Sequence, residues 1–329
     1  MAASRKCDVL IVGAGPAGLA SALFLLRRRP GLAGRIVAIE KARHPRPKVC
    51  GGGLIPKTML ALAELGLELE VPAFEVRRGR ARTEVGAVEI GDGGDVLCTI
   101  VRRDQFDARL ARAAREAGLE IVENCRALGI QQGAAGVRVA SERGVFEAEV
   151  TVVADGSGSR IAAQLMGARK HSIGRAITTD IAVNPEQTQE FAERLYRFDF
   201  NCVGAGIRGY GWSFPCLIGG RPHLNVGIYD QCPRLPVDPG GAKASLVDQL
   251  LAAFPDLPLE GLRTREVGFK AFPIRWYDGR DHFAAQRAIL AGDAAGVDPL
   301  MGEGISCAFE HGKLAAAGVA SFLDGDRTA

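Results

Sequence analysis

The chain has 329 residues and a formal net charge of +3, and 24% of its residues are charged. A balance this close to neutral argues against nucleic acid or an anionic membrane surface as a partner, because both attract strongly basic proteins. At this length the chain can bury a large core and hold two domains or one elaborated domain. Its eight cysteines form no CxxC pair, and its five histidines are scattered. We therefore expect free thiols in a reducing, cytoplasmic compartment and no metal site.

The first motif lies where an apolar segment meets a run of glycines. Residues 8–12 (DVLIV) are typical of a parallel strand buried on both faces, and GAGPAG follows directly at 13–18. In a strand–turn–helix unit, Gly13 permits the turn, Gly15 lets a pyrophosphate approach the backbone, and Gly18 lets the helix lie close to the strand. The helix N-terminus then offers N–H groups and a positive dipole end to the phosphates.

The residues that follow also indicate a bound dinucleotide. Residues 19–29 favour a helix, residues 35–39 form a second apolar strand, and Glu40 ends it. An acid about 20 residues after the glycines usually binds a ribose hydroxyl, so Glu40 fits an adenosine ribose without a 2′-phosphate. The uncharged residues 9–26 are long enough to span a membrane, but the glycine and proline in their middle argue against a span. We see no signal-peptide pattern.

A basic, proline-broken segment at 41–48 leads into VCGGGL at 49–54. Proline forbids a regular element here, and three consecutive glycines would let the backbone press against a flat ligand. A flexible surface loop is the alternative. Residues 56–67 then place apolar side chains at helical spacing, and Gly66 ends this predicted helix.

The middle of the chain alternates between strand and helix patterns. Residues 75–100 predict short antiparallel strands with a turn at 91–94, and residues 106–117 predict an amphipathic helix. Further strands are predicted at 120–122, 136–140, 145–149 and 150–154. The last strand ends at Asp155, and ligands of open α/β sheets lie at such carboxyl ends.

A second long β-rich segment is predicted at 178–270, with one helix at 242–254. It concentrates aromatic side chains that would form either a hydrophobic sheet face or an apolar substrate pocket. They are Phe198, Phe200, Tyr210, Trp212, Phe214 and Tyr229. The chain then returns to the first pattern, with a strand at 288–291, a turn at 292–296 and a final apolar helix that opens at 301–305 and runs to Leu323.

Three separated signatures stand in order along the chain: GAGPAG at 13–18, ADG at 154–156 and GDAAGVDPLMGEGI at 292–305. Together they resemble the glutathione-reductase-type flavoproteins of the p-hydroxybenzoate hydroxylase group. Within this group the chain is most similar to the geranylgeranyl reductase family of FAD-dependent oxidoreductases. That likeness is carried by KVCGGGL at 48–54, VRRDQFD at 101–107, GYGWSFP at 209–215 and the GEGI form of the last signature.

The resemblance implies an α/β fold in which a Rossmann-like FAD-binding domain carries an inserted, antiparallel β-rich substrate domain, as in p-hydroxybenzoate hydroxylase. We expect a discontinuous FAD-binding domain over residues 1–74, 101–175 and 271–329. The substrate domain would then comprise residues 75–100 and 176–270.

The resemblance also assigns contacts to FAD. Gly13, Gly15 and Gly18 would cradle the pyrophosphate, Glu40 would bind the adenosine ribose, and Ala127 would lie under the adenine. Cys50, Gly51 and Gly53 would line the isoalloxazine. Arg103 would reach the diphosphate or ribityl region, Asp155 would help to fix the phosphate end, and Asp293 would bond the ribityl chain or pyrophosphate. Gly304 and Ile305 would face the pyrimidine edge of the flavin.

The substrate side of the resemblance includes one departure. Tyr210, Trp212 and Phe214 match the YxWxFP substrate motif of the family. The GxG that follows in the family is matched only at a longer spacing, by Gly227-Ile228-Tyr229. A tyrosine at position 229 would shorten or reshape the pocket for a polyprenyl chain. Family members also carry a further C-terminal segment, so we expect a smaller substrate or a more open pocket.

The leading hypothesis is an FAD-dependent reductase of isolated carbon–carbon double bonds in a prenyl or similarly apolar substrate. Reduced flavin would deliver hydride to one alkene carbon, and Cys50 is the catalytic candidate for tuning the flavin or delivering a proton. The alternatives are an FAD-dependent monooxygenase that hydroxylates a small aromatic or natural-product substrate, and a non-catalytic flavoprotein partner.

The other expectations concern partners. The external electron donor, NAD(P)H or ferredoxin, stays open because this architecture has no separate nicotinamide domain. We expect an apolar or lipid substrate, no nucleic acid and no transmembrane segment. A lipid substrate would bring peripheral contact with a membrane.

Overall fold

The fold comes from a computed structural model that describes residues 4–167, 173–231, 245–259, 268–277, 279 and 282–325. Its helices are α1 (Pro16–Arg28), α2 (Pro56–Glu64), α3 (Arg103–Glu116), α4 (Arg160–Met166), α5 (Gln189–Ala192), α6 (Leu246–Ala253) and α7 (Ile305–Leu323). Strands in the first half are β1 (Ser4–Lys6), β2 (Val9–Val12), β3 (Ile36–Ile39), β4 (Gly53–Leu54), β5 (Ala73–Val76), β6 (Arg78–Thr83), β7 (Gly86–Gly91), β8 (Cys98–Val101), β9 (Glu120–Val122), β10 (Ala127–Gly133), β11 (Gly136–Ser141), β12 (Gly144–Ala148) and β13 (Val150–Val153). Strands in the second half are β14 (Ile173–Ala182), β15 (Leu195–Asp199), β16 (Gly209–Ile218), β17 (Arg221–Asp230), β18 (Lys270–Arg275), β19 (Ala284–Ala285) and β20 (Ala288–Leu290).

A six-stranded sheet of order β19-β20-β13-β2-β3-β9 organises one end of the molecule, and all its strands except β19 run parallel. Residues of β2 alternate between two cores, as the period of a strand requires. Val9 and Ile11 pack with α1, α3 and α7. Leu10 and Val12 pack against the four-stranded sheet β1-β12-β11-β10. Both faces of the sheet are therefore covered, which explains the continuous apolar run in β2.

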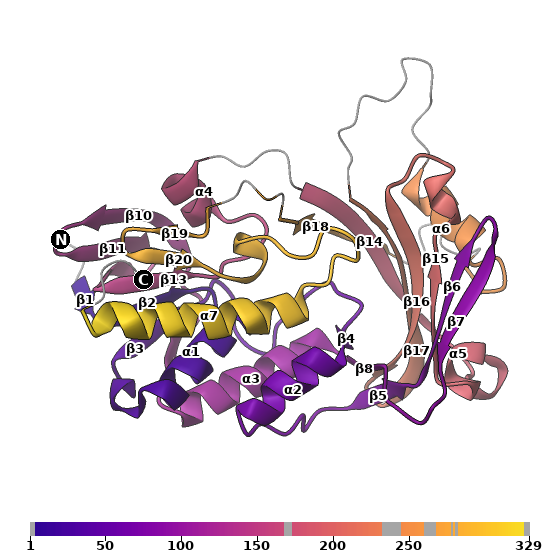
Figure 1. The fold of residues 1–329 in the computed structure, drawn as a ribbon, viewed down its shortest axis with the longest axis horizontal. Coiled ribbons are helices and arrows are strands. Elements are labelled where there is room, and N and C mark those ends of the chain that lie inside the picture. Colours follow the sequence, from indigo (N-terminus) through magenta and orange to yellow (C-terminus); the bar gives the residue numbers. More distant parts are fainter. Residues whose placement is uncertain are drawn as a thin grey trace, which may run out of the picture.

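A seven-stranded sheet of order β18-β14-β17-β16-β15-β6-β7 forms the other end of the molecule (Figure 1). Its pairs are antiparallel except for the parallel pair of β15 and β6. One face packs on α6 through Leu224, Val226 and Ile228. The opposite face carries aromatic rings and is directed toward the first part of the molecule. A small sheet of order β4-β8-β5 lies between the two ends.

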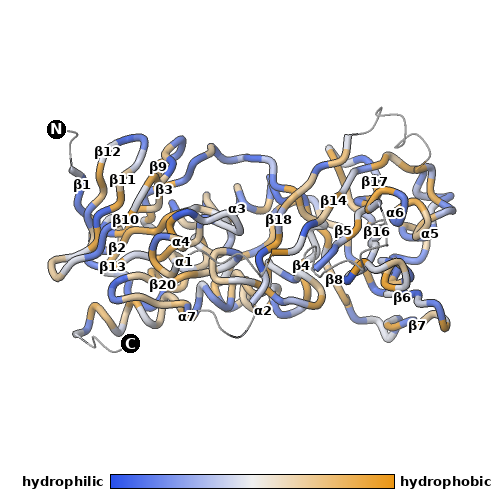
Figure 2. Tube along the Cα trace, turned by 90° about the horizontal axis from the view of Figure 1, so that it is seen from above, coloured by the Kyte–Doolittle hydropathy of each residue, from blue (hydrophilic) through white to orange (hydrophobic). Residues whose placement is uncertain are grey.

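The overall shape is elongated. Figure 2 shows the six-stranded sheet and its helices at one end and the seven-stranded sheet at the other. Helix α7 begins near the seven-stranded sheet and runs away from it, and the loop before α7 extends toward β14 and β18 (Figure 1). The N-terminus of α7 therefore lies where the two ends of the molecule meet.

The predicted mixed α/β class with a Rossmann-like sheet is confirmed, whereas several element boundaries differ. Helix α3 begins at Arg103 and not at Phe106, and α2 ends at Glu64, before the predicted end at Gly66. Of the helix predicted at 242–254, residues 242–244 lie outside the described residues and 246–253 form α6. Strands β1 and β10 were not predicted. In the seven-stranded sheet, β18 pairs with β14 as far as Arg275, beyond residue 270, where the predicted substrate domain ends. The division into two domains stays a prediction.

Three further properties bear on function. No helix in the described residues is long and apolar enough to cross a membrane. Seven cysteines are described and all are free thiols, while Cys232 lies outside the described residues. The same part of the chain holds no cluster of three or more side chains that could bind a metal ion.

Candidate functional site

The turn between β2 and α1 is tightly packed. Gly13 has a φ of +100°, and a Cβ there would lie 2.7 Å from the carbonyl carbon of Ala154. A Cβ on Gly18 would overlap the carbonyl oxygen of Gly13. At Gly15 a Cβ would meet only the Arg46 guanidinium, at 3.3 Å. Glycine is thus required for packing at two positions, while the third leaves open backbone beside a cation at the helix N-terminus.

Glu40, at the end of β3, stabilises this turn by hydrogen bonds. It is 4% exposed, and its carboxylate accepts the N–H groups of Ala14 at 2.9 Å and Ala42 at 3.1 Å. Arg46 lies beside it, with Nε 3.6 Å from the Glu40 carboxylate and Nη2 3.4 Å from the Asp107 carboxylate. Within the described part of the chain, Arg46 Nε is buried and makes no hydrogen bond. A buried guanidinium with an unused donor is suited to an anionic group such as a diphosphate.

The glycines at 51–53 press against the aromatic face of the large sheet. Gly52 has a φ of +79°, and a Cβ on it would overlap the Val101 carbonyl oxygen. A Cβ on Gly51 would lie 3.0 Å from the Phe214 ring and 3.5 Å from Nε1 of Trp212. Cys50 is half-buried, and its thiol accepts the Gly52 N–H at 3.4 Å. The structure therefore brings Cys50 and Gly51 together with Trp212 and Phe214, while Gly53 packs against the Cys98 thiol.

Arg103 makes a contact that the motif alone did not predict. It is 7% exposed, and its guanidinium donates two hydrogen bonds to Asp107, at 2.8 and 3.0 Å. Burial disfavours the charge of Arg103, but Asp107 and the Cys50 thiol outweigh it and raise the arginine pKa. Arg103 therefore remains a fixed cation next to Cys50.

Lys48 is a functional candidate that sequence reasoning missed. Its ammonium lies 3.1 Å from the centre of the Phe272 ring in β18 and 3.9 Å from the Asp293 carboxylate. Burial lowers the pKa of Lys48 to about 8, against the attraction of Asp293 and with help from repulsion by Arg103. The sequence shows that Lys48 lies in the basic segment before the glycines. It does not show that the fold largely buries the ammonium group.

We expect Lys48→Met to stabilise the FAD-free protein at pH 7 by about 2 kcal/mol, because the folded state bears the cost of burying the ammonium. The unfolded chain binds more protons than the folded one between pH 8 and the ordinary lysine pKa, so unfolding free energy of the wild type rises with pH in that window. The gain from Lys48→Met should therefore shrink by pH 10. Urea unfolding at both pH values measures this, and Lys57→Met, at an exposed lysine, is the control. A gain that does not change with pH would contradict the argument.

Asp293 and the start of α7 form the next part of the site. The Asp293 carboxylate accepts the Ser157 hydroxyl at 2.9 Å, and a Cβ on Gly304 would lie 3.5 Å from it. Gly304 is the N-cap of α7, and the N–H of Ile305 donates to the Glu303 carboxylate at 3.2 Å. Asp155 lies at the end of β13, where burial raises its pKa to about 6.

The predicted substrate aromatics lie together on one face of the seven-stranded sheet. Tyr210, Trp212 and Phe214 alternate along β16, and Tyr229 lies opposite Tyr210 on β17. Ring centres are 6.2 Å apart for Tyr210 and Trp212 and 6.4 Å apart for Trp212 and Phe214. The remaining aromatics of the segment, Phe198 and Phe200, pack against Tyr210. The aromatic side chains of this segment therefore pack together on one face of the sheet, and their role in binding substrate stays a prediction.

A polar chain behind these rings holds Trp212 in place. Its indole N–H donates to the Asn225 side chain at 2.9 Å, and Asn225 donates to Asp180 at 2.7 Å. Arg102 also donates to Asp180, at 2.9 Å. The Nε1–H of Trp212, which lies on the side of Gly51, is thus satisfied by Asn225 within the protein.

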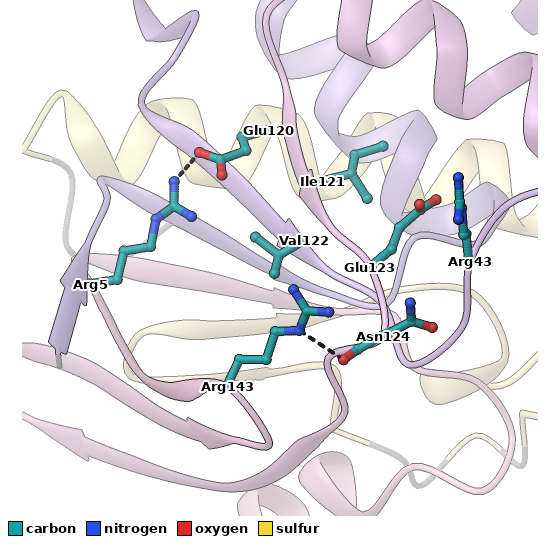
Figure 3. A pocket seen from close by; sticks show the side chains of 8 residues that line it. All are labelled: Arg5, Arg43, Glu120, Ile121, Val122, Glu123, Asn124 and Arg143. Atoms are coloured by element: carbon teal, nitrogen blue, oxygen red, sulfur yellow. Dashed lines mark hydrogen bonds and ion pairs between the residues drawn. The ribbon is translucent and has the colours of Figure 1, made fainter. Parts of the chain in front are cut away.

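Ala127 lies apart from the residues around Cys50. It begins β10 and pairs with Ser141 in the four-stranded sheet. Beyond Glu40, a hollow of about 470 Å³ opens at the edge strand β9 (Figure 3). Charged side chains line much of it, including Arg43, Glu123 and Arg143, and none of the predicted site residues belongs to it. This hollow is therefore distinct from the arrangement of glycines and aromatics described above.

Comparisons of the chain with known proteins identify the family to which it belongs. A family model described as an FAD binding domain matches residues 6–205. A menaquinone reductase of Mycobacterium tuberculosis is 30% identical over 340 residues, which cover 96% of this chain and 77% of that protein. A chloroplastic geranylgeranyl diphosphate reductase of Oryza sativa subsp. japonica is 28% identical over 342 residues, which cover 98% of this chain and 68% of that protein.

The fold is also found in a solved structure, that of a geranylgeranyl bacteriochlorophyll reductase-like protein from Thermoplasma acidophilum. The TM-score is 0.79 at 23% identity, and the match covers 99% of this chain and 81% of the other. The open backbone at Gly15, the unused Arg46 donor and the buried Lys48 ammonium fit a dinucleotide with a diphosphate. The chain belongs to the geranylgeranyl reductase family of FAD-dependent oxidoreductases.

Proposed function

We propose that this protein reduces isolated carbon–carbon double bonds of a prenyl or similarly apolar substrate. The observation that carries the proposal is the contact between the Cys50 loop and the aromatic face of the sheet. The position of a Cβ on Gly51 is 3.0 Å from the Phe214 ring, so no side chain separates the loop backbone from the aromatics. A flat cofactor at the loop and an apolar chain on the rings would meet at this contact.

The residues proposed to hold FAD fall into three groups. Gly13, Gly15 and Gly18 form the diphosphate cradle, and Arg46 adds a cation to it. Glu40 and Ala127 serve the adenosine end, with Asp155 near the phosphates. Cys50, Gly51, Gly53, Arg103, Asp293, Gly304 and Ile305 surround the flavin end. This assignment is supported by the packing of the glycines, by the unused Nε–H donor of Arg46 and by the largely buried ammonium of Lys48.

Bound FAD in its reduced form supplies the hydride, and the protein supplies geometry. The substrate chain would lie on Tyr210, Trp212 and Phe214, which bind it by apolar contact and exclude water. Cys50 directly precedes Gly51 in this loop and is the proposed group that tunes the flavin or passes a proton. The external donor stays open between NAD(P)H and ferredoxin. The names of the relatives, which include reductases of menaquinone and geranylgeranyl diphosphate, support a prenyl substrate.

The proposal is tested by single turnover without oxygen. Purified protein reduced with dithionite is mixed with menaquinone, geranylgeranyl diphosphate or geranylgeraniol, and flavin absorbance is followed. We expect reoxidation with at least one of these, together with a product that has gained two hydrogens in the prenyl chain. Flavin that stays reduced until oxygen is admitted, followed by hydroxylation of an aromatic substrate, would instead make the protein a monooxygenase.

Tyr229 should limit the length of the substrate. It is 1% exposed and its ring packs on Tyr210, with centres 5.8 Å apart. Tyr229→Leu shortens the side chain and should allow longer prenyl chains to bind, at a cost to stability of about 2 kcal/mol. Measured KM values for substrates of increasing prenyl length should shift toward the longer ones. Tyr229→Phe, which keeps the ring, is the control and should leave the length preference unchanged. An unaltered preference in Tyr229→Leu would exclude a role in chain length.

A further inference from the structure

The loop between the short helix Gly292–Ala294 and α7 is ordered by its own acidic side chains. The Asp298 carboxylate accepts the N–H of Leu300 at 3.3 Å and that of Met301 at 2.6 Å. Glu303 accepts the N–H of Ser306 at 3.1 Å and so caps α7. These bonds use the N–H groups of the loop and leave its carbonyl oxygens to find partners elsewhere.

Two tyrosines of the large sheet contact this loop at successive residues. The Tyr210 hydroxyl donates a hydrogen bond to the carbonyl oxygen of Met301. Gly302 has a φ of +62°, and a Cβ on it would lie 3.5 Å from the Tyr229 ring. Tyr210 and Tyr229 are directly opposite each other on β16 and β17. Over residues 298–303 the sheet therefore holds the loop through this hydrogen bond and this ring contact, and just before them the Val297 N–H donates to the Arg275 carbonyl oxygen of β18 at 3.0 Å.

The side of the loop that faces solvent makes few stabilising contacts. Leu300 is 73% exposed and Met301 is 37% exposed. Leu300 therefore buries little apolar area, whereas Met301 is partly covered, so the packing of Leu300 contributes little to the position of the loop. Tyr210 is 8% exposed, and its hydroxyl consequently ties residues 298–303 to the sheet in addition to the backbone hydrogen bond at Val297.

We propose that Tyr210 is a positioning residue, whose hydroxyl fixes the loop at 298–303 and thereby the N-terminus of α7 beside the flavin. The inference rests on the proposed function in one respect, the placement of Gly304 and Ile305 at the pyrimidine edge. The Tyr210 ring also packs edge-on against Phe198, with centres 5.1 Å apart, and so belongs to the aromatic face. An apolar substrate that moves this ring would then alter the flavin environment through Met301.

The test compares Tyr210→Phe with Tyr196→Phe. Tyr196 stands in the same aromatic group on β15, 5.2 Å from Phe198, and its hydroxyl has no hydrogen bond recorded among the described residues. Limited chymotrypsin digestion of FAD-free protein, with mass spectrometry of the fragments, measures cleavage after Leu300 and Met301. We expect Tyr210→Phe to be cleaved there about 2- to 10-fold faster than the wild type, because the loop loses the stabilisation of one hydrogen bond. Tyr196→Phe should be cleaved at the wild-type rate.

Two spectroscopic measurements complete the test. Flavin fluorescence titration should give a dissociation constant for FAD that is about 2- to 10-fold higher in Tyr210→Phe. The change in the visible flavin spectrum on adding geranylgeraniol should be present in Tyr196→Phe and reduced in Tyr210→Phe. Wild-type cleavage and wild-type FAD affinity in Tyr210→Phe would overturn the proposal. Because cleavage of the loop needs neither substrate nor turnover, this result is independent of whether the protein reduces an alkene.

Discussion

Replacing Gly52 by alanine should abolish FAD binding and lower the free energy of unfolding by at least ~3 kcal/mol. Gly52 has a φ of +79°, which an L-residue adopts only with strain. The added Cβ would also overlap the carbonyl oxygen of Val101. That contact cannot relax locally, because the Val101 N–H donates to the Gly52 carbonyl oxygen at 2.9 Å. The loop would have to leave β8, and with it the proposed flavin contacts at Cys50 and Gly51.

Urea unfolding and flavin fluorescence titration measure the two effects separately. Gly93→Ala is the matched control, since Gly93 has no positive φ and a Cβ on it would meet nothing within 4 Å. It should bind FAD normally and unfold within about 0.5 kcal/mol of the wild type. Normal FAD binding by Gly52→Ala would show that the loop can move without loss of the cofactor, and would remove it from the proposed site.

The second large effect concerns Gly227, the residue that makes room for Trp212. A Cβ on Gly227 would lie 2.5 Å from Cη2 of Trp212 and 2.5 Å from the Ile177 carbonyl oxygen. Gly227→Ala should therefore push the indole off its hydrogen bond to Asn225 and cost about 3 kcal/mol of stability. We expect substrate binding to weaken by at least 10-fold, which is about 1.4 kcal/mol, while FAD affinity stays within 2-fold of the wild type.

A double variant gives this prediction its sharpest control. Gly227→Ala combined with Trp212→Phe removes the ring atoms that the new Cβ would strike. Its stability should exceed the value expected from adding the two single changes, because residues in contact are not additive. Strict additivity would mean that Gly227 does not act through Trp212. Gly133→Ala, where a Cβ would meet nothing within 4 Å, controls for the loss of a glycine in a strand.

The parts of the fold that follow from local pattern could be predicted from the sequence. The buried strand β2 needs apolar residues on both faces, and Gly13 and Gly18 are needed by backbone packing that the motif encodes. The aromatic alternation in β16 likewise places Tyr210, Trp212 and Phe214 on one face, since side chains of a strand alternate.

What the sequence could not show depends on contacts between distant segments. The parallel pairing of β6 with β15 joins Arg78 to Leu195, and period alone does not identify a strand's partner. The burial of Lys48 depends on Phe272, and the role of Asn225 depends on Trp212 and Asp180. Strand β10 was missed because its exposed residues show little hydrophobic alternation. Charged or polar residues with a structural role of this kind become visible only when the sheet is assembled.

The most direct test of the central claim is anaerobic turnover in deuterated water. Protein reduced with dithionite in D₂O is mixed with a prenyl substrate, and the product is analysed by mass spectrometry. The proposed reduction predicts flavin reoxidation and one saturated double bond that carries two deuterium atoms, one from the reduced flavin and one from a protein or solvent acid. Reduced flavin that persists with every prenyl substrate, and reacts only when oxygen is admitted, would contradict the account.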